Sequence, residues 1–390
     1  MPFLPQGENT LVGNYLRSPG ENEVEALREF ARNHDFIVLH EWSENKIPIL
    51  RAENPDIVIL LYKGRGFSTN NVETVASYSQ VAHNTSWFMY NSSGQVVSWD
   101  WDGNGTTDGW SPRPENTAYQ QYFINSVLGD LRRGGWDGLL IDDLWTTLTP
   151  YGISPPVHYA NADALCTAMA GFLRNVKSAL NAEGFVLAGN IGWWQQTMAS
   201  GERVGRLYLR EMNMGMQEKF QINYATFWNP GRAWYDEMRA LRADIDATNG
   251  SAFLYARADE LDQRSLMHVL TSQLCITNND GRVVYQMLNT RDSTRVTPVF
   301  PESAAAEALG SPIAPVQWEP VLQLGVRFFE NGFVVVNPNS SLRVLEGFNG
   351  QTTVYGEVID SNKSYDLPAR SGMIFFSPAP FAYANMIGLH

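Results

Sequence analysis

Short runs of apolar and β-branched residues alternate with longer stretches in which apolar positions recur every three or four residues. The short runs are typical of buried strands, and the longer stretches are typical of helices that cover a sheet. Regular alternation of the two predicts a parallel sheet with a helix between successive strands. The predicted strands are 11–16, 36–42, 57–63, 138–142, 186–190, 207–211, 252–257 and 283–287.

Eight strand units predict a closed (β/α)8 barrel, the TIM barrel. Predicted helices between them include 21–33, 161–184 and 233–247. After a Pro- and Ala-rich passage, alternating short runs from about residue 318 onward predict a small antiparallel β domain. We therefore expect a barrel over residues 1–315 and a β-sandwich-like domain over residues 316–390.

Composition narrows the possible partners. Asp and Glu number 41 against 28 Lys and Arg, which gives a formal charge of −13, and no cluster of basic residues offsets it locally. Such a surface repels phosphate backbones and anionic lipid, so we expect neither nucleic acid nor a membrane surface as a partner. We also expect no signal peptide and no transmembrane segment, and the sequence leaves the compartment open. Dispersed histidines and the lack of a Gly-rich phosphate loop disfavour zinc and nucleotide chemistry.

The chemistry of this barrel class takes place at the carboxyl ends of the strands. Alternate residues of a strand share a face, so Asp142 is expected to point to the same side as Leu140, toward the barrel mouth. By the same parity, Glu211 at the end of the predicted sixth strand is expected to point there too. Asp143 follows on the next loop, as support or simply as a helix cap or ion-pair partner.

Two carboxyl groups in one cleft suit glycoside hydrolysis, in which one group protonates the leaving oxygen and the other supports the sugar cation or activates water. Aromatic rings stack on sugar faces, and polar strand ends bind hydroxyl groups. The expected sugar-binding residues are Glu41, Trp42, Tyr62, Lys63, Trp145, Asn190, Trp193, Trp194, Trp228 and Arg257.

Other interpretations of these residues remain open. Trp193 and Trp194 could pack in the core, Lys63 and Arg257 could balance negative charge, and Glu41 could cap a helix. A non-catalytic carbohydrate-binding barrel would keep the aromatic loops without convergent carboxylates. A lyase or aldolase barrel would need a Schiff-base lysine or a metal cluster.

The segment DWDGNGTTD alternates oxygen-bearing side chains with glycines, as in the first part of a calcium loop. Its candidate ligands are Asp100, Asp102, Asn104 and Asp108. Ser111 stands where the bidentate Glu belongs, so a solvated turn is the alternative to a structural calcium site. No cofactor is otherwise expected.

An ordered set of short motifs extends over nearly the whole chain. The pieces lie at 54–62, 87–94, 114–122, 136–143 (WDGLLIDD), 309–312, 329–338 (FENGFVVVNP) and 371–374. In this order and spacing, the sequence resembles the hypothetical glycosyl hydrolase family 15 and related barrel glycosidases. The resemblance implies a carbohydrate-active enzyme with an amylase-like barrel and a C-terminal β domain.

The resemblance also implies roles for two residues. It makes Asp142, on the fourth strand, the nucleophile or base, and a carboxylate on a later strand, here Glu211, the acid. Asp143 stands where relatives often carry Asn, and the DWDGNGTTD insert departs from the family pattern. Whether hydrolysis retains or inverts the anomeric configuration depends on the carboxyl separation, which the sequence leaves undecided.

Overall fold

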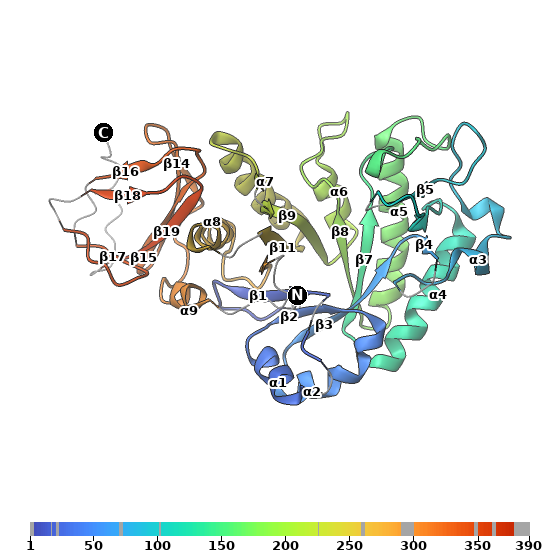
Figure 1. The fold of residues 1–390 in the computed structure, drawn as a ribbon, viewed down its shortest axis with the longest axis horizontal. Helices are drawn as coiled ribbons and strands as arrows, with labels where there is room; N and C mark the ends of the chain where they lie inside the picture. The colour runs from blue at the N-terminus through green and yellow to red at the C-terminus, as the bar shows by residue number, and fades with distance from the viewer. Residues whose placement is uncertain are drawn as a thin grey trace.

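A closed barrel of eight parallel strands forms the centre of the computed structural model (Figure 1). The structure describes residues 4–16, 18–20, 23–69, 73–100, 103–224, 226–258, 262–289, 300–346, 350–360 and 364–377. Strand β9 pairs with both β8 and β11, which closes the ring. In ring order, the strands are β1 (Leu11–Tyr15), β2 (Phe36–Leu39), β3 (Val58–Gly64), β7 (Gly138–Leu144), β8 (Val186–Ile191), β9 (Met214–Tyr224), β11 (Ser251–Ala258) and β12 (Val283–Asn289).

Helices follow each barrel strand and cover the outside of the ring. They are α1 (Val24–Arg32), η1 (Glu41–Lys46) with α2 (Ile47–Glu53), α4 (Thr117–Gly134), α5 (Ala162–Asn181), α6 (Val204–Arg210), α7 (Arg232–Thr248), α8 (Gln263–Leu274) and α9 (Pro301–Glu307). Local chemistry sets several of their ends. The Asn116 side chain accepts a hydrogen bond from the Tyr119 N–H at the start of α4, and Gly135 ends that helix at a positive φ of 71°.

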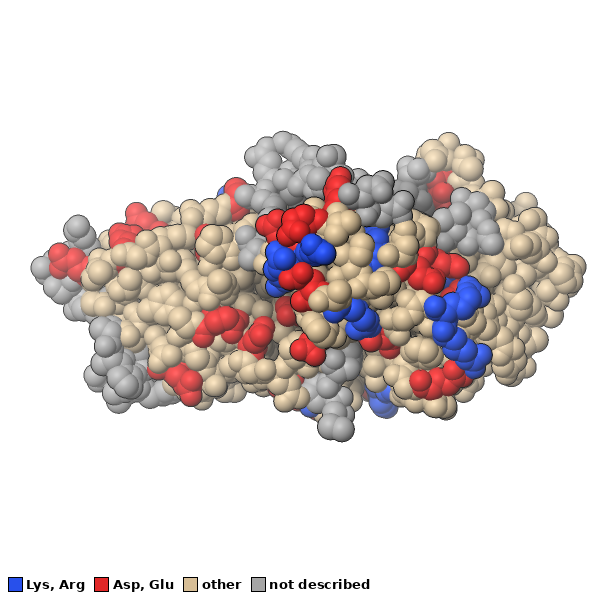
Figure 2. Space-filling model, turned by 90° about the horizontal axis from the view of Figure 1, so that it is seen from below, with Lys and Arg blue, Asp and Glu red and all other residues tan. Residues whose placement is uncertain are grey.

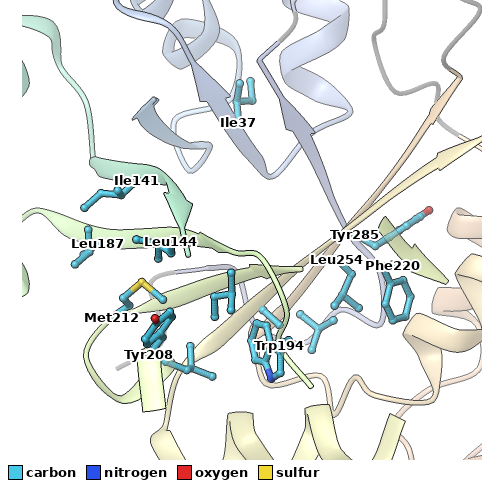
Figure 3. Close-up of a cluster of buried hydrophobic side chains, with 14 of the residues drawn as sticks. Ile37, Ile141, Leu144, Leu187, Trp194, Tyr208, Met212, Phe220, Leu254 and Tyr285 are labelled. Carbon is cyan, nitrogen blue, oxygen red and sulfur yellow. The ribbon is translucent and has the colours of Figure 1, made fainter. Parts of the chain in front are cut away.

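Side chains of the barrel strands alternate between two apolar layers. One layer fills the barrel interior and includes Phe36, Leu60, Leu140 and Phe253. The other faces the helices, and Figure 3 shows part of it, including Ile37, Ile141, Leu187 and Leu254. Neighbouring residues of a strand enter opposite layers. A side chain at the end of a strand therefore reaches the mouth only when it is in step with the interior layer.

A long excursion separates β3 from β7. It contains a small antiparallel sheet of β4 (Phe67–Ser68), β5 (Ser98–Trp99) and β6 (Gly109–Trp110), with the short helices α3 (Tyr78–Val81) and η2 (Thr85–Trp87). A further single-turn helix, η3 (Pro150–Gly152), lies between β7 and α5.

The C-terminal part is an antiparallel sheet that packs on the barrel through α8, which contacts β15 and β19. Its strands are β13 (Gln317–Glu319), β14 (Leu324–Phe329), β15 (Gly332–Asn337), β17 (Thr352–Thr353) and β19 (Ser371–Phe376), with β16 (Arg343–Leu345) and β18 (Tyr365–Leu367) forming a separate pair. The predicted fold class is thus confirmed. The domain boundary between residues 315 and 316 stays a prediction, although β13 begins just after it.

One predicted strand is wrong. Residues 207–211 lie in α6 and at its end, and the sixth barrel strand is β9, beginning at Met214. The interval from β8 to β9 needs a crossover helix, and α6 supplies it. The short strand β10 (Thr226–Phe227) then forms a hairpin with β9.

The surface seen from the side of α1 and α2 carries acidic and basic side chains close together (Figure 2). On these helices, Arg32 bonds Glu53 at 2.6 Å, and Arg51 pairs with Asp137 at 2.7 Å. The basic side chains of this face are thus partly neutralised by neighbouring acids. Within the described part of the chain, no helix has the length and apolar character needed to cross a membrane.

Candidate active site

The carboxyl ends of the barrel strands bring a polar layer together above the apolar interior. Asp142 lies one alternation beyond Leu140, a residue of the interior layer, as strand parity predicts. By the same alternation, Tyr62 faces the same side as Leu60, and Glu218 faces the same side as Met216. The inward-facing set at the mouth is Tyr15, His40, Tyr62, Asp142, Asn190, Glu218 and Arg257.

Asp142 accepts hydrogen bonds at both carboxylate oxygens. The Tyr62 hydroxyl donates to Oδ2 at 2.7 Å and the Tyr15 hydroxyl at 3.2 Å. Asn190 Nδ2 and the Asp143 backbone N–H donate to Oδ1 at 2.9 and 2.8 Å. Burial, followed by the charge of Asp142, raises the pKa of both tyrosines well above the usual value, so they remain donors. Asp142 is therefore fixed in orientation as a hydrogen-bond acceptor.

Asn190 joins Asp142 to a second carboxylate. Its Nδ2 also donates to Glu218 Oε2 at 3.0 Å, so one amide nitrogen contacts both acids. The two oxygens that it contacts are therefore at most about 5.9 Å apart, the sum of 2.9 Å and 3.0 Å. Arg257 donates to the other Glu218 oxygen and forms an ion pair with it. Two carboxylates thus converge on the mouth from the fourth and sixth strands.

Asp143 adds a third acid beside this pair. It has a positive φ of 62° and lies where the pairing of β7 with β8 shifts register, the sign of a bulge that redirects its side chain. Its Oδ1 accepts a hydrogen bond from Tyr151 at 3.0 Å. Burial, followed by the charge of Asp142, raises the pKa of Asp143 to about 7. This carboxyl therefore changes charge near neutral pH.

A buried arginine supports the backbone at this bulge. Arg65, whose side chain is fully buried, donates to the Asp143 carbonyl at 3.2 Å and to the Pro112 carbonyl at 3.0 Å. Its guanidinium also lies over the Trp145 ring, 4.8 Å from the ring centroid. The contacts join the base of the β3–β7 excursion to the strand end that carries Asp142 and Asp143.

Comparison with protein families gives a match that spans these residues. The model of the hypothetical glycosyl hydrolase family 15 matches residues 51–333, most of the chain and the part that carries Asp142, Asn190, Glu218 and Arg257. The chain belongs to this family. Family membership makes glycoside hydrolysis its activity class and agrees with the resemblance seen in the sequence motifs. A search of curated proteins finds no significant match.

Solved structures share the fold at low sequence identity. A maltogenic α-amylase from Thermotoga neapolitana is 11% identical with a TM-score of 0.53, and the match covers 94% of this chain and 98% of that one. Trehalose-6-phosphate hydrolase from Bacillus licheniformis is 10% identical with a TM-score of 0.54, and the match covers 94% of this chain and 99% of that one. An α-amylase from Malbranchea cinnamomea is 11% identical with a TM-score of 0.50, and the match covers 94% of this chain and 96% of that one. These similarities support the barrel fold of this family member.

Glu211, expected from the sequence to be the family's acid, does not reach the mouth. It caps the end of α6, and its carboxylate accepts hydrogen bonds from Arg174 at 2.7 and 3.1 Å. The next residues approach the beginnings of β8 and β11, so Glu211 lies at the opposite end of the barrel from Asp142. The expectation that these two carboxylates converge is wrong, because the segment that carries Glu211 is a helix rather than a strand.

Lys63 and Glu41 also lie away from the mouth. Lys63 has the parity opposite to that of Tyr62 and extends outward, where it bonds Glu41 at 2.8 Å and approaches Asp130 of α4 at 3.3 Å. Arg133 is the second partner of Glu41. These two residues connect the helices outside the barrel, and the structure does not bring them to the carboxylate pair.

The tryptophans expected to bind sugar divide into buried and exposed rings. Trp145 and Trp194 are buried, the first under Arg65 and the second bonded to Asp244 at 3.1 Å, so they act in packing. Trp193 and Trp228 are exposed in the segments that follow β8 and β9. Trp42 is exposed as well and stacks on His40, whose ring contacts Tyr62 edge-on.

The acidic loop after β5 forms a turn within itself. The Asp100 carboxylate accepts backbone N–H groups of Gly103 at 2.8 Å and Gly105 at 2.7 Å, in the manner of an Asx turn. Asp102 lies outside the described residues. Across the described ranges, no three His, Cys, Asp or Glu side chains lie together as a metal-binding group. The calcium site stays a prediction.

Sequence reasoning missed Glu218, Tyr15, Arg65 and Tyr151. The signal for Glu218 is present in MGMQE, where Met214, Met216 and Glu218 occupy alternate positions of a strand. The predicted sixth strand also began only 17 residues after the fifth ended, with no helix assigned between them. A crossover helix is required there, and placing it at α6 would have moved the strand to β9.

Proposed function

We propose that the chain hydrolyses O-glycosidic bonds of an oligo- or polysaccharide with retention of anomeric configuration, with Asp142 as the nucleophile and Glu218 as the acid and base. The observation that carries this proposal is the Asn190 amide nitrogen that contacts both carboxylates. Retaining glycosidases hold their carboxyl groups about 5–5.5 Å apart, whereas inverting enzymes separate them by about 6.5–9.5 Å. An upper limit of about 5.9 Å between the nearer oxygens favours retention.

The chemistry follows from these positions. Asp142 attacks the anomeric carbon, the bond to the leaving oxygen breaks, and protonated Glu218 gives that oxygen its proton. Ionised Glu218 then removes a proton from water, the water oxygen attacks the same carbon, and the Asp142 ester bond breaks. Tyr15 and Tyr62, both bonded to Asp142, orient the attacking carboxylate.

Two further features support a sugar ligand. Asn190 Oδ1 is buried, and no described protein group donates to it, so a sugar hydroxyl is a suitable donor. Exposed aromatic rings follow three successive strands, with Tyr151 after β7, Trp193 after β8, and Tyr224 and Trp228 near the end of β9. Such rings suit stacking against sugar faces, because their apolar area is otherwise left in water.

In this proposal Asp143 supports the nucleophile. With a pKa raised to about 7, it is largely protonated in mildly acidic solution and adds no second negative charge beside Asp142. The hydroxyl bonded to it belongs to Tyr151, the exposed ring on the loop after β7. Asp143 therefore links the charge of the mouth to the position of that loop.

The proposal is tested by assaying a panel of glycans for released reducing ends with the parent and Asp142→Asn. The panel begins with α-glucans, because α-amylases share the fold. We expect release by the parent and none above background by the variant. Proton NMR of the first product then reports its anomeric configuration, and an inverted product would overturn the retaining assignment. Binding of a glycan by both proteins with hydrolysis by neither would favour a non-catalytic sugar-binding barrel instead.

A further inference from the structure

A buried carboxylate on α7 lies behind the sixth barrel strand. Glu237 is 6% exposed, and its hydrogen-bond partners are side-chain amides. No Lys, Arg or His of the described residues forms an ion pair with it. A buried charge without a counter-charge is costly unless donors surround it, so this cluster of amides needs an explanation.

The three shortest of these bonds come from the segment that carries Glu218 and the residues just after it, and Gln195 Nε2 of the β8–α6 connection donates to Glu237 Oε1 at 3.5 Å. Gln217 Nε2 donates to Glu237 Oε1 at 2.7 Å, and Gln221 Nε2 donates to Oε2 at 2.8 Å. Asn229 Nδ2 donates to the same Oε2 at 2.7 Å. Gln217 directly precedes Glu218, Gln221 lies three residues after it, and Asn229 follows Trp228. Glu237 therefore holds the β9–β10 hairpin on both sides of the carboxylate that faces Asp142.

The same hairpin has an unusual concentration of strained backbone. Lys219, Gln221, Tyr224 and Asn229 have φ values of 66°, 59°, 57° and 49°. A left-handed backbone is sterically unfavourable for residues other than glycine, although Asn tolerates this region better. Such a conformation persists only when contacts from outside impose it. Glu237 contacts two of the four, Gln221 and Asn229.

A carboxylate suits this position better than a neutral amide. Its two oxygens offer only acceptor sites, so they accept hydrogen bonds from all four amide groups at once. A glutamine at 237 would turn its own N–H groups toward some of these amides, so that donor would face donor without an acceptor between them. The negative charge also strengthens each hydrogen bond.

We propose that Glu237 is a positioning residue, whose buried carboxylate holds the strained β9–β10 hairpin so that Glu218 faces Asp142. The inference rests on the proposed function, because Glu218 is its acid and base. Glu237 is buried on α7 and acts on Glu218 through Gln217, Gln221 and Asn229.

The first experiment compares Glu237→Gln with Asp244→Asn. Asp244 is a matched control because it is a fully buried carboxylate on the same helix, paired with Arg203 and Arg206 of the α6 region. We expect kcat/KM to fall about 10- to 100-fold in Glu237→Gln, mainly in kcat, with a shifted pH profile. In Asp244→Asn, we expect lower stability with kcat/KM within about threefold. Equal losses of kcat in the two folded variants would overturn the proposal.

Rescue tests the charge directly. The double variant Glu237→Gln with Gln221→Glu returns one carboxylate to the cluster, and we expect it to recover most of the lost kcat. No recovery would overturn the proposal. If Glu237→Gln does not fold, Asn229→Gly removes one donor while allowing the positive φ of 49°, and it should lower kcat by a smaller factor. An unchanged kcat in Asn229→Gly would then overturn it.

Hydrogen exchange separates this inference from the proposed function. Glu237→Gln should lose amide protection over residues 214–224 and keep it over β7, whether or not Glu218 is catalytic. Unchanged protection over β9 would overturn the positioning role. Loss of protection there, together with full activity of Glu218→Gln, would leave the positioning role standing and refute the assignment of Glu218.

Discussion

Glu218 and Glu211, seven residues apart, are similar in burial and ion pairing but differ in the groups that surround them. Each is partly or fully buried, and each pairs with an arginine. The Glu211 partner, Arg174, is 64% exposed, whereas the Glu218 partner, Arg257, is 21% exposed. Only Glu218 shares a hydrogen-bond donor with a second carboxylate. Burial and ion pairing therefore do not distinguish the proposed acid Glu218 from Glu211, whereas a neighbouring carboxylate at the strand ends does.

The strongest test of this comparison removes the second carboxylate. Asp142→Asn should lower kcat/KM at least ~10⁴-fold, because the amide cannot form the ester to the anomeric carbon. Steady-state kinetics on the glycan identified by the panel measures the loss. Thermal unfolding of the variant serves as the control for folding, and activity within tenfold of the parent would refute Asp142 as the nucleophile.

Glu218→Gln should have the next largest effect. Loss of the proton donor should lower kcat about 10²- to 10⁴-fold on a substrate with a poor leaving group. With a dinitrophenyl glycoside the first step needs little acid assistance, so a smaller loss is expected there. Added azide should restore turnover and give a glycosyl azide with retained configuration. Lack of rescue, or equal losses on both substrates, would contradict the acid and base role.

Asp143→Asn sharpens the comparison through pH. The pKa of Asp143 is raised to about 7 by burial and by Asp142, so the folded protein holds this proton more tightly than the unfolded chain. In the parent, this group therefore lowers stability as pH rises from about 4 to about 7. Denaturant unfolding should show Asp143→Asn gaining more than about 1 kcal/mol relative to the parent between pH 4.5 and pH 7.5. A difference in unfolding free energy between variant and parent that stays constant with pH would show that the pKa of Asp143 is not raised.

The smallest effect is expected at Glu211. Glu211→Gln should leave kcat and KM within about twofold, because the residue caps α6 at the end of the barrel opposite the mouth. The lost bond to the exposed Arg174 should cost about 1 kcal/mol of stability, which chemical denaturation measures. A loss of activity as large as that of Glu218→Gln would remove the distinction between the two glutamates.

The sequence predicted the barrel and half of the carboxylate pair. Period-2 alternation located β7 and gave Asp142 its inward direction, since a strand fixes side-chain parity. The segment LYLRE has the apolar content of either a short strand or a buried helix turn, and periodicity over so few residues does not separate the two. Because of that ambiguity, the sequence predicted Glu211 as the acid, whereas the structure places Glu218 opposite Asp142.

Other parts of the site depend on tertiary contacts that no local pattern contains. Lys63 ends a strand as expected, but its parity directs it outward, and only the positions of Glu41 and Asp130 explain its burial. The tyrosine donors to Asp142 come from β1 and β3, distant in sequence from β7. The left-handed backbone at Asp143 depends on the bulge at the end of β7 and on support from Arg65.

The contacts of Arg65 have a consequence for how this scaffold can vary. Arg65 and Ser111, at the two ends of the excursion between β3 and β7, are bonded at 3.1 Å, and the Tyr119 hydroxyl of α4 bonds the Arg65 carbonyl at 2.6 Å. The tip of the excursion is largely exposed between residues 91 and 95. Insertions or exchanged loops at the tip should therefore be tolerated without disturbing the carboxylate pair at the barrel mouth.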